Sequence, residues 1–171
     1  MQNYLFIIAM ALAAIIIAAP HNAAAQPQPK SFGFGLILGD PTGLTLKGSL
    51  GGNNSWDAAI GSSWFGSIRL HGDYLWAADV FNSRKAGLYF GLGGVIGFGN
   101  GGGGVLYKGE RGRWYYSDDD RIWLGVRGSA GVNFMPFSAP VEIFGEIAPV
   151  IGLTPVTGVG WDAALGIRYY P

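Results

Sequence analysis

The chain has 171 residues, of which 30 are glycine, 13% are charged and none is cysteine, and its 11 Lys and Arg residues balance 11 Asp and Glu residues. This length favours one domain, the balanced charge gives no basic excess that would bind a nucleic-acid backbone, and the lack of cysteine excludes disulfides and thiolate metal sites. Soluble domains carry about 25% charged residues, so the low charge predicts that something other than water covers much of the surface.

An apolar segment stands at the start of the chain. Residues 4–19 are almost wholly apolar and uncharged, and they lead into the small residues Ala23, Ala24 and Ala25. This order is typical of a secretory signal peptide, and a run of about 16 apolar residues is shorter than the roughly 20 that a membrane-spanning helix needs. We therefore predict a signal peptide over residues 1–25 and an exported domain over residues 26–171.

After residue 30, apolar and polar residues alternate with period two between Gly, Pro, Asn and Asp residues, which is typical of β-strands. Most of the predicted strands are near the 9 to 11 residues that a tilted strand needs to cross a bilayer. The seventh is ended before Pro149, because proline removes a hydrogen bond from a strand ladder; a bulge or rim is expected there. The eight predicted strands cover residues 31–38, 43–50, 55–64, 68–78, 86–98, 121–134, 141–148 and 159–170.

The two faces of these strands differ in chemistry, since one carries the large apolar residues and the other carries the charged residues and many glycines. Alternation alone fits both a soluble barrel and its inverted, lipid-facing counterpart. The glycines on the charged face, the aromatic residues near strand ends on the apolar face and the signal-like leader favour lipid outside. The sequence therefore predicts an all-β fold, a closed antiparallel eight-stranded transmembrane β-barrel in the bacterial outer membrane.

The charged face is then the barrel interior, where an unpaired ion is costly. Eight strands give an interior just wide enough for side chains to fill, so a filled lumen is favoured over an ion path. The predicted lumen charge network comprises Lys47, Asp57, Arg69, His71, Asp73, Arg127, Glu142, Glu146, Asp162 and Arg168.

Aromatic residues on the apolar face predict belts at the two bilayer interfaces. There they would contact outer-membrane lipid and lipopolysaccharide. The predicted belt residues are Trp56, Trp64, Tyr74, Trp76, Phe98, Phe134, Trp161 and Tyr169.

The longest predicted connection covers residues 99–120 and would lie outside the cell, where outer-membrane barrels place their longer loops. Arg, Trp and Tyr are frequent anchors of binding surfaces, so the loop is a candidate site for an extracellular partner or surface glycan. A solvated, variable loop is the alternative. The candidate recognition residues are Arg111, Arg113, Trp114, Tyr115 and Tyr116.

No cofactor, metal site or catalytic residue is predicted. Residues 97–102 match G-x-G-x-x-G, but more glycine follows where a dinucleotide site needs a helix. The consecutive residues Asp118, Asp119 and Asp120 lack the spaced ligands of a calcium loop. His71 has no serine on its own predicted strand, so a structural interior histidine is favoured over a Ser-His-acid site.

Five segments are distributed over most of the predicted strands: residues 39–47 (GDPTGLTLK), 70–76 (LHGDYLW), 124–127 (LGVR), 143–150 (IFGEIAPV) and 167–170 (IRYY). Together they resemble a family of small bacterial outer-membrane β-barrel proteins with an outer membrane protein A/X-like barrel. The resemblance implies an integral outer-membrane barrel that the barrel-assembly machinery inserts, and it brings no catalytic residues. A structural or surface-interaction role is the favoured function; the alternatives are a narrow channel for small solutes and a lipid-A-modifying enzyme.

Overall fold

The structure is a computed structural model, and its regular elements are all β-strands within the part of the chain that it describes. Among these residues there is no helix of a length and hydropathy that would cross a membrane. The predicted signal peptide over residues 1–25 lies outside the described residues. The described residues are 32–63, 68–78, 80–81, 83, 85–98, 106–108, 114–116, 122–136, 140–155 and 157–171.

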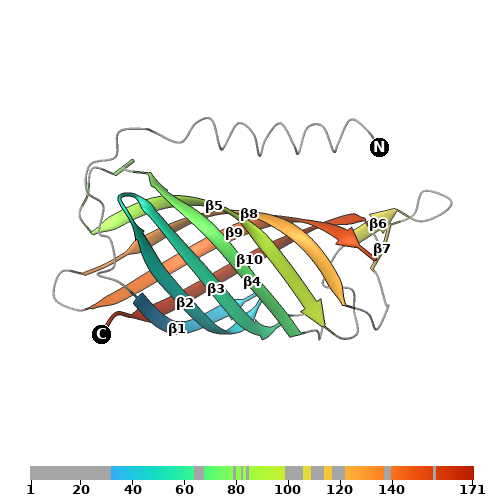
Figure 1. Cartoon of the computed structure of the whole chain (residues 1–171), viewed down its shortest axis with the longest axis horizontal. Coiled ribbons are helices and arrows are strands. Elements are labelled where there is room, and N and C mark those ends of the chain that lie inside the picture. The colour runs from blue at the N-terminus through green and yellow to red at the C-terminus, as the bar shows by residue number, and fades with distance from the viewer. Residues whose placement is uncertain are drawn as a thin grey trace.

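Eight strands form a closed antiparallel barrel, as predicted (Figure 1). Each strand pairs with the next along the chain, and the last pairs with the first from Phe34 opposite Tyr169 to Gly39 opposite Ala164. Because of this closure, the barrel sheet has no edge strand. The barrel strands are β1 (Phe32–Gly39), β2 (Thr42–Gly51), β3 (Asn54–Ser62), β4 (Ile68–Ala78), β5 (Ala86–Phe98), β8 (Trp123–Phe134), β9 (Val141–Thr154) and β10 (Gly158–Tyr169).

Two further short strands, β6 (Leu106–Lys108) and β7 (Trp114–Tyr116), lie between β5 and β8. They pair with each other, and β6 also pairs with β10 through Leu106 opposite Val159. Figure 1 shows this pair at the end of the barrel opposite the C-terminus. Residues 99–120 were predicted to be one connection without these two strands, because three-residue strands are too short to show a period.

The prediction that the seventh strand ends at Ala148 is wrong, since β9 continues through Pro149 to Thr154. Pro149 pairs with Trp161 in an unbroken ladder with β10. On the other side, the ladder between β8 and β9 skips Gly128 and Ser129, the positions that face Pro149 and Ala148. A proline lacks only one hydrogen-bond donor, so the pairing is interrupted on one side while the strand continues.

Charged and apolar side chains separate between the inside and the outside of the barrel. Every charged residue on the eight barrel strands is buried, whereas large apolar side chains are exposed on all eight. Apolar side chains complete the interior, among them a cluster of Val95, Trp123 and Val150. The interior is therefore a mixed core in which ion pairs are packed between aromatic and aliphatic side chains.

Candidate functional site

The charged interior is the candidate site, and all ten residues of the predicted lumen charge network are buried in it. The ion pairs join residues from β2, β3, β4, β8, β9 and β10 and from the β1–β2 turn. They fall into three groups along the barrel, and the first group lies at the end that holds the C-terminus.

Glu142 is the centre of the first group and is fully buried. Its Oε1 accepts hydrogen bonds from Lys47 Nζ at 2.6 Å and from Asn133 Nδ2 at 2.9 Å. Its Oε2 accepts from the Tyr170 hydroxyl at 2.6 Å and from Arg168 Nη1 at 3.4 Å. Four donors from β2, β8 and the C-terminal end of β10 therefore converge on one carboxylate, which compensates the loss of its hydration.

Arg168 connects this group to the middle of the barrel. Its Nη2 lies 2.9 Å from Asp57 Oδ2 and donates to Thr45 Oγ1 at 2.8 Å, and its Nε also donates to Thr45 at 3.1 Å. The guanidinium carbon lies 3.8 Å from the centre of the Phe144 ring, in cation–π contact. The Arg168 guanidinium group is thus held by hydrogen bonds to Thr45, an ion pair with Asp57 and a contact with the Phe144 ring.

The middle group is built around Arg127 and Glu146. Arg127 Nη2 lies 2.8 Å from Glu146 Oε1, and Arg127 Nε lies 3.5 Å from Asp73 Oδ2. The Tyr89 hydroxyl donates to Glu146 Oε2 at 3.0 Å, and Lys47 Nζ lies 5.2 Å from the centre of the Tyr89 ring. His71 is buried in the same region.

Arg69 forms the third group, at the end of the barrel that holds β6 and β7. It makes a two-pronged contact with Asp162, with distances of 2.8 and 2.9 Å, and its Nη1 lies 2.9 Å from Asp40 Oδ1. Asp40 also accepts a hydrogen bond from the Ser63 hydroxyl at 2.9 Å. The guanidinium carbon of Arg69 lies 5.0 Å from the centre of the Trp123 ring, in cation–π contact.

Several polar partners of this network are not among its ten predicted residues. Thr45, Asn133 and Tyr170 have the same parity as the charged residues on their own strands, and Tyr89 has the parity of the inner-face glycines of β5, so alternation places all four inside. Asp40 could not be found in this way, because it lies in the turn between β1 and β2, where alternation stops.

Three interior aromatic rings lie against glycines on the neighbouring strand. Tyr89 is opposite Gly131, Trp123 is opposite Gly97 and Phe144 is opposite Gly166 in the strand registers. A Cβ atom built on any of these glycines would overlap the ring opposite it. The glycines predicted on the inner face therefore have a specific use, which is to let bulky rings lie along the wall of a narrow barrel.

Replacing Gly131 with alanine is expected to destabilise the barrel by about 1–3 kcal/mol, the usual cost of overpacking. The new methyl group would displace the Tyr89 ring and weaken its hydrogen bond to Glu146. Gly94→Ala is the matched control, because a Cβ there meets only a backbone oxygen at 3.8 Å. Urea unfolding of both variants in detergent micelles measures the difference, and equal stabilities would contradict the prediction.

The predicted aromatic belt residues within the described ranges lie on the outer face, and Trp64 lies outside these ranges. Tyr74, Phe98, Phe134, Trp161 and Tyr169 are exposed, whereas Trp56 and Trp76 are half-buried. Neighbouring rings contact one another near the C-terminal end of the barrel. The contacting pairs are Phe32 with Trp56, Phe34 with Tyr169, and Tyr74 with Trp76, with centroids 6.2, 6.1 and 5.0 Å apart.

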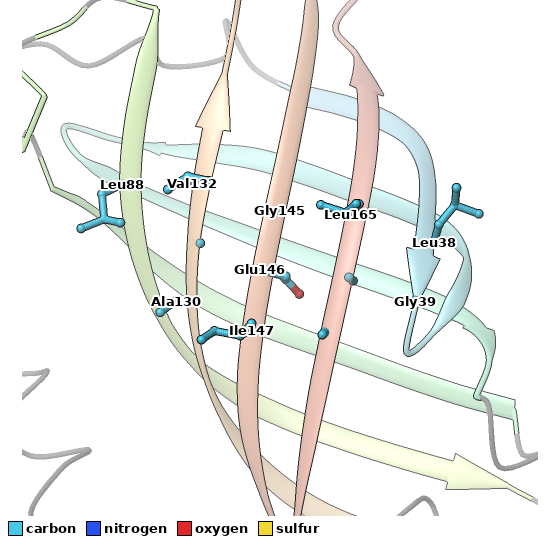
Figure 2. Close-up of a pocket in the computed structure, with 12 residues that line it drawn as sticks. Leu38, Gly39, Leu88, Ala130, Val132, Gly145, Glu146, Ile147 and Leu165 are labelled. Atoms are coloured by element: carbon cyan, nitrogen blue, oxygen red, sulfur yellow. The ribbon is translucent and has the colours of Figure 1, made fainter.

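Figure 2 shows an apolar pocket that is lined from β1, β5, β8, β9 and β10. The exposed side chains of Leu38, Val132, Ile147 and Leu165 take part in its lining. Glu146 is the one charged residue among the lining residues, and its carboxylate is engaged by Arg127 and Tyr89. The pocket therefore offers aliphatic contacts and no free charged group.

The predicted loop-recognition residues are only partly described. Arg111 and Arg113 lie outside the described residues, whereas Trp114, Tyr115 and Tyr116 form β7 and pair with Lys108, Tyr107 and Leu106. The fold therefore places the three aromatic residues at one end of the barrel.

Among the described residues, one group of interior side chains brings metal-ligating atoms together, and it is formed by Asp57, His71 and Asp73. No metal site was predicted from the sequence. All three residues are buried, and they belong to the neighbouring strands β3 and β4.

Comparisons of the chain with protein-family models, with curated proteins and with solved structures found no match.

Proposed function

We propose that this protein is an integral β-barrel of the bacterial outer membrane, with a structural or surface-interaction role and a lumen filled by side chains. Its leader directs export, and the barrel-assembly machinery inserts the domain over residues 26–171. The surroundings of the barrel wall are outer-membrane lipid and lipopolysaccharide. The role is non-catalytic and needs no cofactor, and the segment over residues 99–120 is where an extracellular partner would bind.

The outer surface carries this proposal. All eight strands expose large apolar side chains, including Leu36 at 56%, Leu165 at 69% and Trp161 at 72%. All charged residues of these strands are buried instead. In water-soluble proteins Lys, Arg, Asp and Glu are mostly exposed, so this distribution is inverted. A surrounding of hydrocarbon accounts for both halves of the inversion.

Closure of the sheet supports the same environment. In a bilayer no water is present to satisfy backbone N–H and C=O groups, and a barrel without edges satisfies them internally. The outer aromatic rings near the strand ends fit the interfaces, where the amphipathic rings of Trp and Tyr are favoured.

The network inside the barrel supports a structural role. Fully buried arginines and their carboxylates occupy the lumen from the Glu142 group to the Arg69 group. Such ions are locked in pairs, so they hold opposite walls together and leave little space for a passing solute. A steady conductance in planar bilayers would contradict this and favour the channel.

The proposal is tested by fractionation and gel migration. We expect the protein in the outer-membrane fraction, extracted only with detergent, and we expect its unboiled form to migrate differently from its boiled form on an SDS gel. The reason is that a closed barrel resists SDS until heating breaks its ladder. The boiled sample of the same preparation is the control.

A protein that is freely soluble without detergent and shows one mobility in both samples would overturn the proposed membrane location.

A further inference from the structure

Three side chains with metal-ligating atoms meet inside the barrel. Asp57 on β3 lies directly opposite Asp73 on β4, and His71 is two residues before Asp73 on the same face of β4. One ligating atom from each residue lies within 4.8 Å of those of the other two. The three side chains are only 2 to 4% exposed. The group is therefore enclosed and is set by the register of two neighbouring strands.

Atoms of this group are left without protein partners. Asp57 Oδ1 and His71 Nδ1 are buried and have no hydrogen-bond partner. Asp57 uses only its other oxygen, Oδ2, which pairs with Arg168. Buried polar atoms in native proteins nearly always have a partner, so these two atoms are available to bind a further ligand.

The charges on the two strands indicate that the ligand is a cation. Like charges directly opposite each other in a sheet are destabilising, and Asp57 and Asp73 are such a pair. The described part of the interior has the same imbalance, because its buried charged residues comprise six carboxylates and four cations, a formal charge of −2 with neutral His71. A divalent cation between the two aspartates would balance both the pair and the lumen.

We propose that Asp57, His71 and Asp73 bind one divalent transition-metal ion inside the barrel. Imidazole and carboxylate ligands suit Zn²⁺ and its neighbours in the first transition row, whereas all-oxygen sites suit Ca²⁺ and Mg²⁺. Two ligands of one zinc ion, each about 2.0–2.2 Å from it, lie at most roughly 4.4 Å apart. Small side-chain movements bring the three atoms into this range.

The surrounding residues orient the ligands. Arg168 holds Asp57 through Oδ2, and Asp73 has the Arg127 guanidinium and the Ser129 hydroxyl beside it. Contacts of this kind around metal ligands fix their orientation. Gly93 leaves the space that the Asp73 carboxylate occupies, because a Cβ at Gly93 would overlap Asp73 Oδ1. The ion would join β3 to β4 and relieve the repulsion between them.

The test uses the full chain, unfolded in urea and folded into detergent micelles with either Zn²⁺ or a chelator present. Folding in the presence of the metal is needed because the site is enclosed. After removal of free metal, we expect elemental analysis to find one Zn²⁺ per chain. We also expect the Zn²⁺-loaded protein to unfold at a higher urea concentration than the chelator-treated protein, because a ligand that binds only the folded state stabilises it.

Two ligand variants and one control complete the test. His71→Gln and Asp73→Asn are expected to lower zinc affinity at least tenfold and to remove the stabilisation by Zn²⁺. Asp162→Asn makes the same carboxylate-to-amide change in the Arg69 group, outside the three ligands, and should keep the zinc. Heat-dependent gel migration shows which variants are folded, and only folded protein is compared.

Less than one tenth of a zinc ion per folded wild-type chain would overturn the proposal, as would equal zinc retention by all three variants. Neither outcome bears on the membrane location, since a barrel that folds without detergent would contain the same three residues.

Discussion

Leu165→Arg is expected to lower the free energy of unfolding by about 2–4 kcal/mol, the cost of an arginine on the lipid face near the bilayer midplane. Leu165 lies near the middle of β10 and is 69% exposed on the outer face. If the barrel were surrounded by water, the same change would be a surface substitution, with an effect within about 0.5 kcal/mol. Urea titration of the protein in lipid vesicles, followed by tryptophan fluorescence, separates the two cases.

Leu153→Arg is the matched control for this variant. Leu153 is 54% exposed and is the penultimate residue of β9, near one end of the barrel. The cost of arginine on the lipid face falls to about 0–1 kcal/mol near an interface. A large difference between the two variants supports lipid around the barrel, whereas two equally small effects would argue against it.

Glu142→Leu is expected to destabilise the barrel by about 3–5 kcal/mol, the usual cost of removing one partner from a buried ion pair. The change leaves Lys47 without the carboxylate that lies 2.6 Å from it, and it removes the acceptor of Asn133 and Tyr170. Urea unfolding in micelles measures the loss.

Two further variants separate charge from packing at this position. Glu142→Gln retains an acceptor oxygen and nearly the same volume, so it should cost less than Glu142→Leu. Adding Lys47→Met to Glu142→Leu removes the unpaired cation and should recover part of the loss, since a buried pair replaced by apolar residues is often tolerated. Lys47→Met alone completes the comparison. If the loss of unfolding free energy in the double variant equals the sum of the losses in Glu142→Leu and Lys47→Met, the two residues are not coupled.

Local patterns were sufficient to predict most strands. The bounds of β4 and β5 agree with the predicted ranges over residues 68–78 and 86–98, because alternation there runs uninterrupted up to turn-forming residues. The prediction was wrong after Ala148, because it assumed that Pro149 interrupts the pairing of β9 with both neighbouring strands, whereas only the pairing with β8 is interrupted. In the barrel the ladder with β10 keeps β9 extended past Pro149.

Strand parity also predicted which charges would lie together on one face, but it could not predict their partners. Lys47 and Glu142 are 95 residues apart, and Arg168 and Asp57 are 111 residues apart. Which side chains meet across a lumen depends on the tilt and stagger of the closed strands. These quantities are properties of the whole barrel and leave no signal in any one strand.

The sequence by itself thus determined that this chain forms strands with one apolar and one charged face, because a period of two is a local property of an extended backbone. Only the tertiary structure decided the ion pairs, the inward turn of Asp40 and the meeting of Asp57 and Asp73 across β3 and β4. The physical reason is that closure of the barrel fixes the register of every strand against its neighbours, and register sets the distances on which ion pairing and metal binding depend.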